Sequence, residues 1–414
     1  MVMGLLAGLT AFTVDAQIAT RYRSAESFYV TRRPPELEEY NLKSGRLKGH
    51  VVGRLETEYN DNLFISKIDP KSDFMLHPSL DLRLHWAATR NQTLHFDVGI
   101  GYRCYVEDSQ LDYLSIAPNS RLEYRLILPD ARVQILFFEA LGTTVDPTSR
   151  PDMSLVGTNA SQGAIFRNLT SASGLDVEWQ PTRASRVAAG YSFTLDRSLS
   201  EDFTYYDSDV HSIRLGGDYT VSSAWNVGVQ GSYSVTEHVE NLLNNGDTYT
   251  IGPQVNFVPF RAVSAFGTFG YTVYDFDSSG TTSDTSDFSG LTFQAGIRHT
   301  LSRAVTHSLQ GGRRVDASFY LGSNYTDLWS VQYEINTTLT RRLKGAGRLI
   351  YENYSVSGPG GDQGNQYVVQ LTTGYELARR WNLGLVYSFV IRDASQTVLD
   401  YTQNRVNLQV THRF

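Results

Sequence analysis

Arginines and carboxylates occupy alternate positions along many stretches of this chain, and this spacing puts charged groups on one face of an extended strand. The densest example is Arg121, Glu123 and Arg125, with Arg103 expected on the neighbouring strand. Burial of so many charges in a dry core would be prohibitive, so this face requires water. Its arginines and acids are nearly equal in number, and many are expected to pair between neighbouring strands. The residues selected as lining this face are Arg54, Arg83, Arg103, Arg121, Glu123, Arg125, Arg214, Arg298, Arg314, Glu334, Arg348 and Arg405.

Groups that could carry out nucleophilic catalysis are few. His77 and Ser79 share one parity, and Asp209 lies two residues before His211. Neither pair comes with a third partner at a spacing that would complete a catalytic triad. No catalytic residue is therefore predicted and the chain is not expected to be an enzyme, with a hydrolase at the outer rim as the less favoured alternative.

Metal-ligating patterns are equally weak. The stretch DFDSSGTTSDTSD places Asp275, Asp277, Ser279 and Gly280 like the start of a calcium loop, but its twelfth position is Ser286 instead of a glutamate. A solvated acidic loop explains it better. The single cysteine excludes an intramolecular disulfide framework and a cysteine-based zinc site. Neither a metal nor a cofactor is predicted.

The elements that carry the charged face are runs of alternating apolar and polar residues. In FMLHPSLDLRLHW, for example, Leu80, Leu82 and Leu84 oppose Asp81 and Arg83. Eighteen such runs of roughly 10 to 14 residues follow one another from Leu47 to the end of the chain, about the length that a tilted strand needs to cross a bilayer. Brief and long connections alternate between them, which indicates nine hairpins in series.

The predicted fold is all-β, a closed up-and-down antiparallel transmembrane β-barrel of about 18 strands with long extracellular loops and short periplasmic turns. Tryptophans support this prediction, because Trp86, Trp179, Trp225 and Trp381 all lie beside short turns, as expected for an aromatic belt at the membrane interface. A soluble β-propeller or sandwich is the alternative, but it would expose the whole apolar face. The net charge of −7 argues against a nucleic-acid partner.

The last run, NRVNLQVTHRF, ends on Phe414 and alternates except at His412, which falls on the apolar side. Because a barrel has no free edge, this run should pair with the first one, around Leu47 to Tyr59. It also resembles the C-terminal strand of Gram-negative outer-membrane proteins. That resemblance implies that Phe414 is an assembly signal read by the barrel-assembly machinery.

Three segments are predicted along the chain. Residues 1–16 have an apolar run and a small-residue cleavage pattern typical of a signal peptide, although a basic start is missing and a buried N-terminal helix is the alternative. Residues 17–44 show no alternation and are expected to form a polar periplasmic lead-in. Residues 45–414 form the transmembrane barrel, located in the cell outer membrane in contact with its lipid and lipopolysaccharide.

The long and the short connections between the runs carry opposite charges. The long loops are rich in aspartate and the short turns in arginine, among them Arg90, Arg183, Arg261 and Arg303. Acidic outer loops could bind divalent cations that bridge lipopolysaccharide, but solvation alone also explains them. The longest loop, residues 142–163, is the best candidate for a segment that folds inward and constricts a channel.

Tyr59-Asn60-Asp61-Asn62-Leu63-Phe64, at the end of the first run, resembles the corresponding segment of the putative β-barrel porin 2 group. Members of that group are often linked to exopolysaccharide synthesis and export, so the resemblance implies a channel for polar solutes or for a polysaccharide. Ile65 stands where the group commonly has an arginine. A plugged structural barrel that binds partners through its loops is the alternative. If the channel is open, Arg121 and Arg125 are expected to make it weakly anion-preferring.

Overall fold

A computed structural model describes residues 40–118, 120–144, 167–281, 283–318, 321–359 and 361–414. The predicted signal peptide, the lead-in up to residue 39 and residues 145–163 of the predicted constriction loop lie outside these residues. Within them, no helix is long and apolar enough to cross a membrane. The helices are three short 3-10 turns, η2 (Ser109–Leu111), η5 (Glu201–Tyr206) and η6 (Thr397–Leu399).

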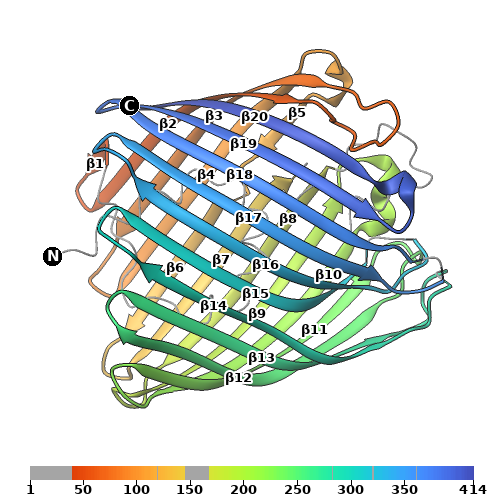
Figure 1. Ribbon diagram of the computed structural model, residues 1–414. Helices are drawn as coiled ribbons and strands as arrows, with labels where there is room; N and C mark the ends of the chain where they lie inside the picture. The colour runs from red at the N-terminus through yellow and green to blue at the C-terminus, as the bar shows by residue number, and fades with distance from the viewer. Residues whose placement is uncertain (1–39, 119, 145–166, 282, 319–320, 360) are drawn as a thin grey trace.

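The strands form one antiparallel sheet that closes on itself into a barrel (Figure 1). Eighteen positions make up its wall, one of them shared by two short strands, so the predicted fold and strand number are confirmed. The wall strands are β2 (Leu47–Asn60), β3 (Asp73–Ala87), β4 (Gln92–Tyr105), β5 (Tyr113–Ile116) with β6 (Ser120–Leu128), β7 (Val133–Thr144), β8 (Asn168–Trp179), β9 (Ser185–Ser198), β10 (Ser208–Thr220), β11 (Trp225–His238), β12 (Gly246–Phe260), β13 (Val263–Phe276), β14 (Phe288–Thr300), β15 (Val305–Ala317), β16 (Tyr325–Thr338), β17 (Leu343–Val356), β18 (Gln363–Ala378), β19 (Trp381–Ala394) and β20 (Tyr401–Arg413).

The fourth wall position is interrupted where the sequence contains Pro118, which has no N–H to donate to a ladder. The side chain of Thr143 on β7 replaces the missing ladder contacts, because its hydroxyl accepts from Ile116 N at 2.9 Å and donates to Ile116 O at 3.1 Å. Gly142 lets Pro118 approach β7, since a Cβ at residue 142 would lie only 2.4 Å from Pro118 Cα. The run predicted as one strand is therefore two, β5 and β6.

The barrel closes between the first and the last wall strand, as predicted. β20 pairs with β2 from Val52↔Arg413 to Asn60↔Arg405. The Phe414 ring lies over Gly53, where a Cβ would be 3.2 Å from Phe414 Cε2. The ring of His412 contacts those of Trp381 and Phe414, with centroids 4.4 and 4.8 Å away. This aromatic cluster explains why a histidine occupies the apolar side of the last run.

Residues 40–44, predicted to belong to an irregular lead-in, contain a short strand. β1 (Leu42–Ser44) pairs with the start of β2 after a turn at Gly45, whose φ is +59°. Asn41 joins this hairpin to the end of the chain, because its side-chain amide donates to Phe414 O at 2.6 Å and to Val51 O at 2.9 Å. β1 thus covers the part of the β2 edge that β20 does not reach.

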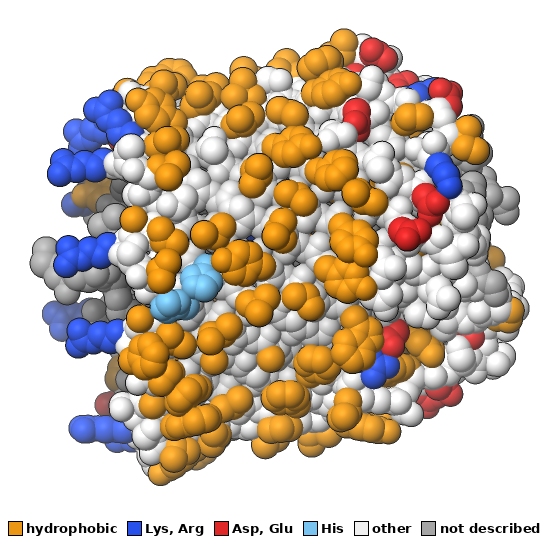
Figure 2. Space-filling view, in the orientation of Figure 1, with side chains coloured by type: hydrophobic (Ala, Val, Ile, Leu, Met, Phe, Trp, Pro, Cys, Tyr) orange, Lys and Arg blue, Asp and Glu red, His pale blue; other side chains and the backbone are white. Residues whose placement is uncertain are grey.

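Apolar side chains cover the outside of the barrel in a broad band between its two ends (Figure 2). At the end that carries the short turns, Trp86, Trp179, Trp225 and Trp381 are between 44% and 48% exposed. Exposed tyrosines such as Tyr271 and Tyr367 lie toward the long loops. These two belts and the apolar band are those of a membrane barrel, and they exclude the soluble propeller or sandwich.

Candidate functional site: the inner wall

All twelve residues predicted to line the inner face lie on the side of their strands opposite to the exposed apolar residues. On β10, for example, Arg214 lies between Ile213 and Leu215, which are 48% and 59% exposed. On β20, Arg405 precedes Val406, which is exposed on the outside. Strand parity therefore placed every one of these residues on the inner face.

Among the described residues, the inner charges pair both along a strand and between neighbouring strands. Arg54 on β2 reaches Asp81 on β3 at 3.0 Å, and Arg348 on β17 reaches Glu334 on β16 at 3.2 Å. Arg314 pairs with Asp316 of its own strand at 2.8 Å. Opposite charges paired across strands stabilise the wall.

One pair crosses an intervening strand. Arg214 on β10 contacts Asp176 on β8 at 3.2 Å, over Gly190 of β9. A Cβ at residue 190 would lie 2.3 Å from Asp176 Oδ1, so only glycine leaves room for this contact. The sequence showed a glycine in a strand but gave no indication of which charges it brings together.

The predicted basic strip on β6 is surrounded by acids. Glu123 lies between the two arginines, 2.5 Å from Arg121 and 3.8 Å from Arg125. Asp97 stands opposite Arg121 in the ladder, and Glu178 interacts electrostatically with Arg125. These three acids therefore offset the positive charge of the two arginines.

Arg103 does not flank this strip, contrary to the prediction. It pairs in the ladder with Tyr113 of β5, six residues along β4 from Asp97, and donates to the sulfur of Met75 at 3.5 Å. The break between β5 and β6 separates it from Arg121. Arg298 also stands apart, because none of the described residues forms an ion pair with it.

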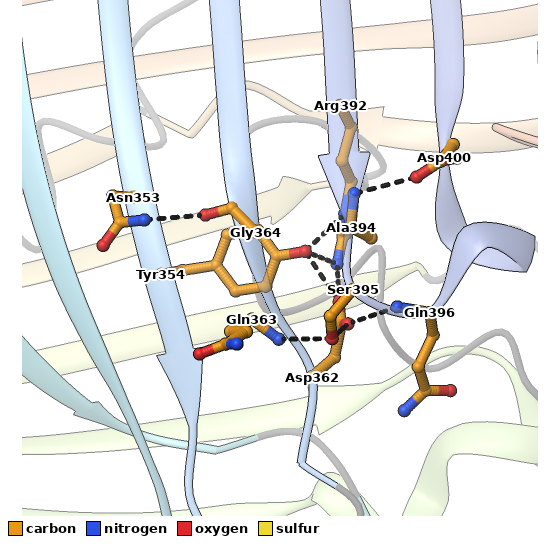
Figure 3. A network of polar contacts seen from close by, with 10 residues as sticks. All are labelled: Asn353, Tyr354, Asp362, Gln363, Gly364, Arg392, Ala394, Ser395, Gln396 and Asp400. Atoms are coloured by element: carbon orange, nitrogen blue, oxygen red, sulfur yellow. Dashed lines mark hydrogen bonds and ion pairs between the residues drawn. The ribbon is translucent and has the colours of Figure 1, made fainter.

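The end of the barrel that carries the long loops holds a buried ionic network that the sequence analysis missed (Figure 3). Arg392 of β19 contacts Asp362 at 3.2 Å, and both side chains are fully buried. Tyr354 lies between them, with its hydroxyl 2.7 Å from Asp362 Oδ2 and its ring 4.6 Å from the Arg392 guanidinium. Alternation along β19 would have placed Arg392 on the inner face, but Asp362 is in a loop and had no periodic signal.

A second network joins four long loops. Asp284 accepts hydrogen bonds from Asn324 N at 2.8 Å and from the side chains of Ser286 and Ser357. Asn244 donates to Asp284 O at 3.1 Å and to Asn324 Oδ1 at 3.0 Å. Burial alone would raise the pKa of Asp284, but the hydrogen bonds from Ser286, Ser357 and Asn324 outweigh it and lower this pKa below its usual value.

The candidate calcium loop uses its carboxylates internally. Asp277 accepts hydrogen bonds from the backbone and hydroxyl of Ser279 and from Asn245 N. These bonds outweigh the effect of burial and lower the pKa of Asp277. Among the described residues, no three His, Cys, Asp or Glu side chains are grouped so that they could hold a metal ion.

His77 contacts a serine, although not Ser79. Its Nε2 lies 2.8 Å from Ser115 Oγ and its Nδ1 lies 3.3 Å from Glu56 Oε2, the order of a serine–histidine–acid triad. Ser115, however, is only 7% exposed and lies within β5, in register with Gly101 of β4. Its backbone belongs to the sheet ladder, so the oxyanion donors that acyl transfer needs are not available there. The geometry supports a structural chain of hydrogen bonds across β2, β3 and β5.

A closed antiparallel barrel of eighteen strands, with a belted apolar outer surface and a charged inner face, is the architecture of an outer-membrane β-barrel. In agreement, the family described as Putative beta-barrel porin 2 matches residues 267–414. This match confirms the resemblance inferred from residues 59–64, although those residues lie outside the matched region. None of the curated protein sequences compared with the chain matches it.

Solved structures agree on the fold. The chain is similar to OccK2 (OpdF) of Pseudomonas aeruginosa, with a TM-score of 0.51, 12% identity and coverage of 89% of this chain and 98% of that one. The structure of OccK2 in complex with glucuronate gives a TM-score of 0.50 at 11% identity, with coverage of 89% and 98%. OccAB3 of Acinetobacter baumannii gives a TM-score of 0.50 at 11% identity, with coverage of 88% and 99%.

Proposed function

We propose that the protein is a water-filled channel through which small polar solutes diffuse across the outer membrane. The observation that carries this proposal is the direction of the inner ion pairs. Within the described part of the wall, the pairs join residues of the same strand, of adjacent strands, or of strands one apart, as in Arg54–Asp81 and Arg214–Asp176. Because these pairs run along the wall, they do not draw opposite sides of the barrel together. Barrels of 16–18 strands are wide enough to leave an aqueous channel.

The proposed channel prefers anions weakly. Arg298 is exposed and has no acidic partner among the described residues. OccK2, which shares the fold, was solved with the anion glucuronate bound. Export of a polysaccharide gains no support from the comparisons, and the structure offers no observation that favours it. Phe414, whose ring is exposed at the seam, is also proposed as the residue that the barrel-assembly machinery reads.

Single-channel recording in planar bilayers tests the proposal. Insertion of the folded protein is expected to give discrete conductance steps that scale with salt concentration. Heat-modifiable migration on gels would establish that the inserted protein is folded. A folded barrel that inserts without conductance would overturn the proposal and favour the plugged, partner-binding alternative, for which the inward packing around Tyr354 and Arg392 is the structural support.

A further inference from the structure

The short turns of the barrel are strongly basic. The residues that separate consecutive wall strands at this end include nine arginines and a single acid, Asp130. In Figure 2 these cationic side chains project from one rim of the barrel, beyond the apolar band. On the face shown, unpaired positive charge is therefore concentrated at the rim that carries the short turns.

Almost all of these guanidinium groups have no partner among the residues that the structure describes. Arg132 donates to Pro181 O at 3.1 Å. The other eight are exposed, and no side-chain hydrogen bond, ion pair or ring contact joins them to a described residue. These eight are Arg90, Arg183, Arg261, Arg303, Arg341, Arg342, Arg379 and Arg380. Outward arginines near the long loops differ, since Arg313 pairs with Asp327 at 2.7 Å and Arg197 pairs with Asp209.

A repeated spacing connects five of the free arginines to the lipid-facing surface. Each lies four residues after an outward ring, so that the ring faces outward near the end of a strand and the arginine occupies the turn. Trp86, Trp179 and Tyr375 are 47%, 48% and 40% exposed. Phe257 stacks on Trp225 with a centroid distance of 4.1 Å, and His299 contacts His307. The five pairs are Trp86 with Arg90, Trp179 with Arg183, Phe257 with Arg261, His299 with Arg303, and Tyr375 with Arg379.

The chemistry of this unit fits a phospholipid. Trp and Tyr rings settle where the hydrocarbon meets the headgroups, so a guanidinium held just beyond Trp86, Trp179 or Tyr375 lies at the depth of the lipid phosphates. Guanidinium binds phosphate through two parallel hydrogen bonds, and an arginine without a partner in the protein loses no ion pair when it does so. Basic residues at a membrane surface also attract anionic lipids over a Debye length.

We propose that the five ring–arginine units form a girdle that binds anionic phospholipid headgroups in the leaflet at the short-turn end. The units occur on five separate hairpins, β3–β4, β8–β9, β12–β13, β14–β15 and β18–β19, and are therefore distributed around the circumference. This distribution matches a ring of lipids and does not match a single soluble ligand or one folded partner. The girdle is independent of whether the lumen conducts.

Electron spin resonance of spin-labelled lipids tests the girdle on the whole protein reconstituted in phosphatidylcholine vesicles. The association of labelled phosphatidylglycerol is compared with that of labelled phosphatidylcholine. The unmodified protein is expected to favour phosphatidylglycerol by about twofold or more at low salt, and this preference should disappear near 1 M KCl, where the Debye length is only about 3 Å. Because both leaflets contain the probe, the orientation of insertion does not affect the result.

Two matched variants separate charge from geometry. Changing Arg90, Arg183, Arg261, Arg303 and Arg379 together to glutamine should remove most of the preference, whereas changing the same five to lysine should retain most of it. A ratio of one in the unmodified protein, a ratio that salt does not change, or an equal ratio in the glutamine variant would overturn the proposal. The salt series needs only the unmodified protein, so it decides the question even if a fivefold variant does not fold.

Discussion

The two ends of the barrel differ in whether their charged side chains are buried and paired or exposed. At the long-loop end, Arg392 and Asp362 are fully buried and bound to each other, and Asp284 is enclosed by hydrogen bonds from three loops. At the short-turn end, eight arginines stand exposed without a described partner. A buried charge must be neutralised within the protein, whereas an exposed charge is available to the surroundings. The first end is therefore built for internal cohesion and the second for contact with the membrane.

The same substitution at each end should give the largest contrast. Arg392→Met leaves Asp362 buried without its cation and is expected to cost about 3–5 kcal/mol of unfolding free energy. The matched change Arg303→Met, at an exposed turn, should cost less than about 0.5 kcal/mol. Denaturant unfolding in lipid vesicles, followed by tryptophan fluorescence, measures both. Equal losses in the two variants would contradict the contrast between the ends.

Acid should loosen the long-loop end only at very low pH. The pKa of Asp284 is lower in the folded protein than its usual value of 3.8, so its stabilising hydrogen bonds are complete above that value and are lost as the pH falls through the folded pKa. A spin label at Thr281→Cys, on a background without Cys104, should stay immobile at pH 4 and become mobile as the pH drops below 3.8.

Asp284→Asn provides the control for this acid response. The amide cannot accept from Asn324, Ser286 and Ser357 as a carboxylate does, so the label should already be mobile at neutral pH. The Asp277→Asn variant should change the label less, because the described hydrogen bonds of Asp277 reach Ser279 and Asn245 and neither Asn324 nor Ser357. A label that is mobile in the unmodified protein at pH 7 would show that the four loops are not joined.

The smallest effect is expected between the ends, at the inner wall. Glu123, Asp97 and Glu178 offset the charge of Arg121 and Arg125, and salt screens wall charges beyond about 8 Å at physiological ionic strength. The reversal potential in a KCl gradient should therefore indicate a weak anion preference. Arg121→Glu combined with Arg125→Glu should shift it toward cations, with Arg303→Glu at the rim as the comparison. A strong cation preference of the unmodified protein would show that the acidic loops dominate.

Strand parity predicted most of the wall from the sequence. Because side chains alternate strictly between the faces of a strand, the exposed position of Trp86 and the inward position of Arg54 follow from periodicity alone. The closing pair of strands also followed, since a barrel leaves no edge unpaired. Periodicity could not foresee the break at Pro118, where the neighbouring Gly142 and Thr143 decide how the chain is accommodated.

Contacts between segments that are distant in the chain could not be predicted from the sequence. Arg103 was expected beside Arg121, but the break between β5 and β6 assigns it to Tyr113. Asp362 and Asp284 lie in loops, where residue type gives no direction for a side chain. Their partners come from segments 30 and 40 residues away, Arg392 and Asn324. Such contacts depend on how loops fold over the barrel, and local pattern carries no information about that.

The hydrogen bond of 2.6 Å between Asn41 and Phe414 has a consequence for the order of the chain itself. The two ends of the described part of the chain lie next to each other at the seam between β2 and β20, so a short linker could join them. A permuted chain could join Phe414 to residue 40 through a short linker and begin instead in the loop between β13 and β14. Such a chain would keep every strand pairing of the wall. The strand pairing of the barrel therefore does not depend on which connection carries the chain ends.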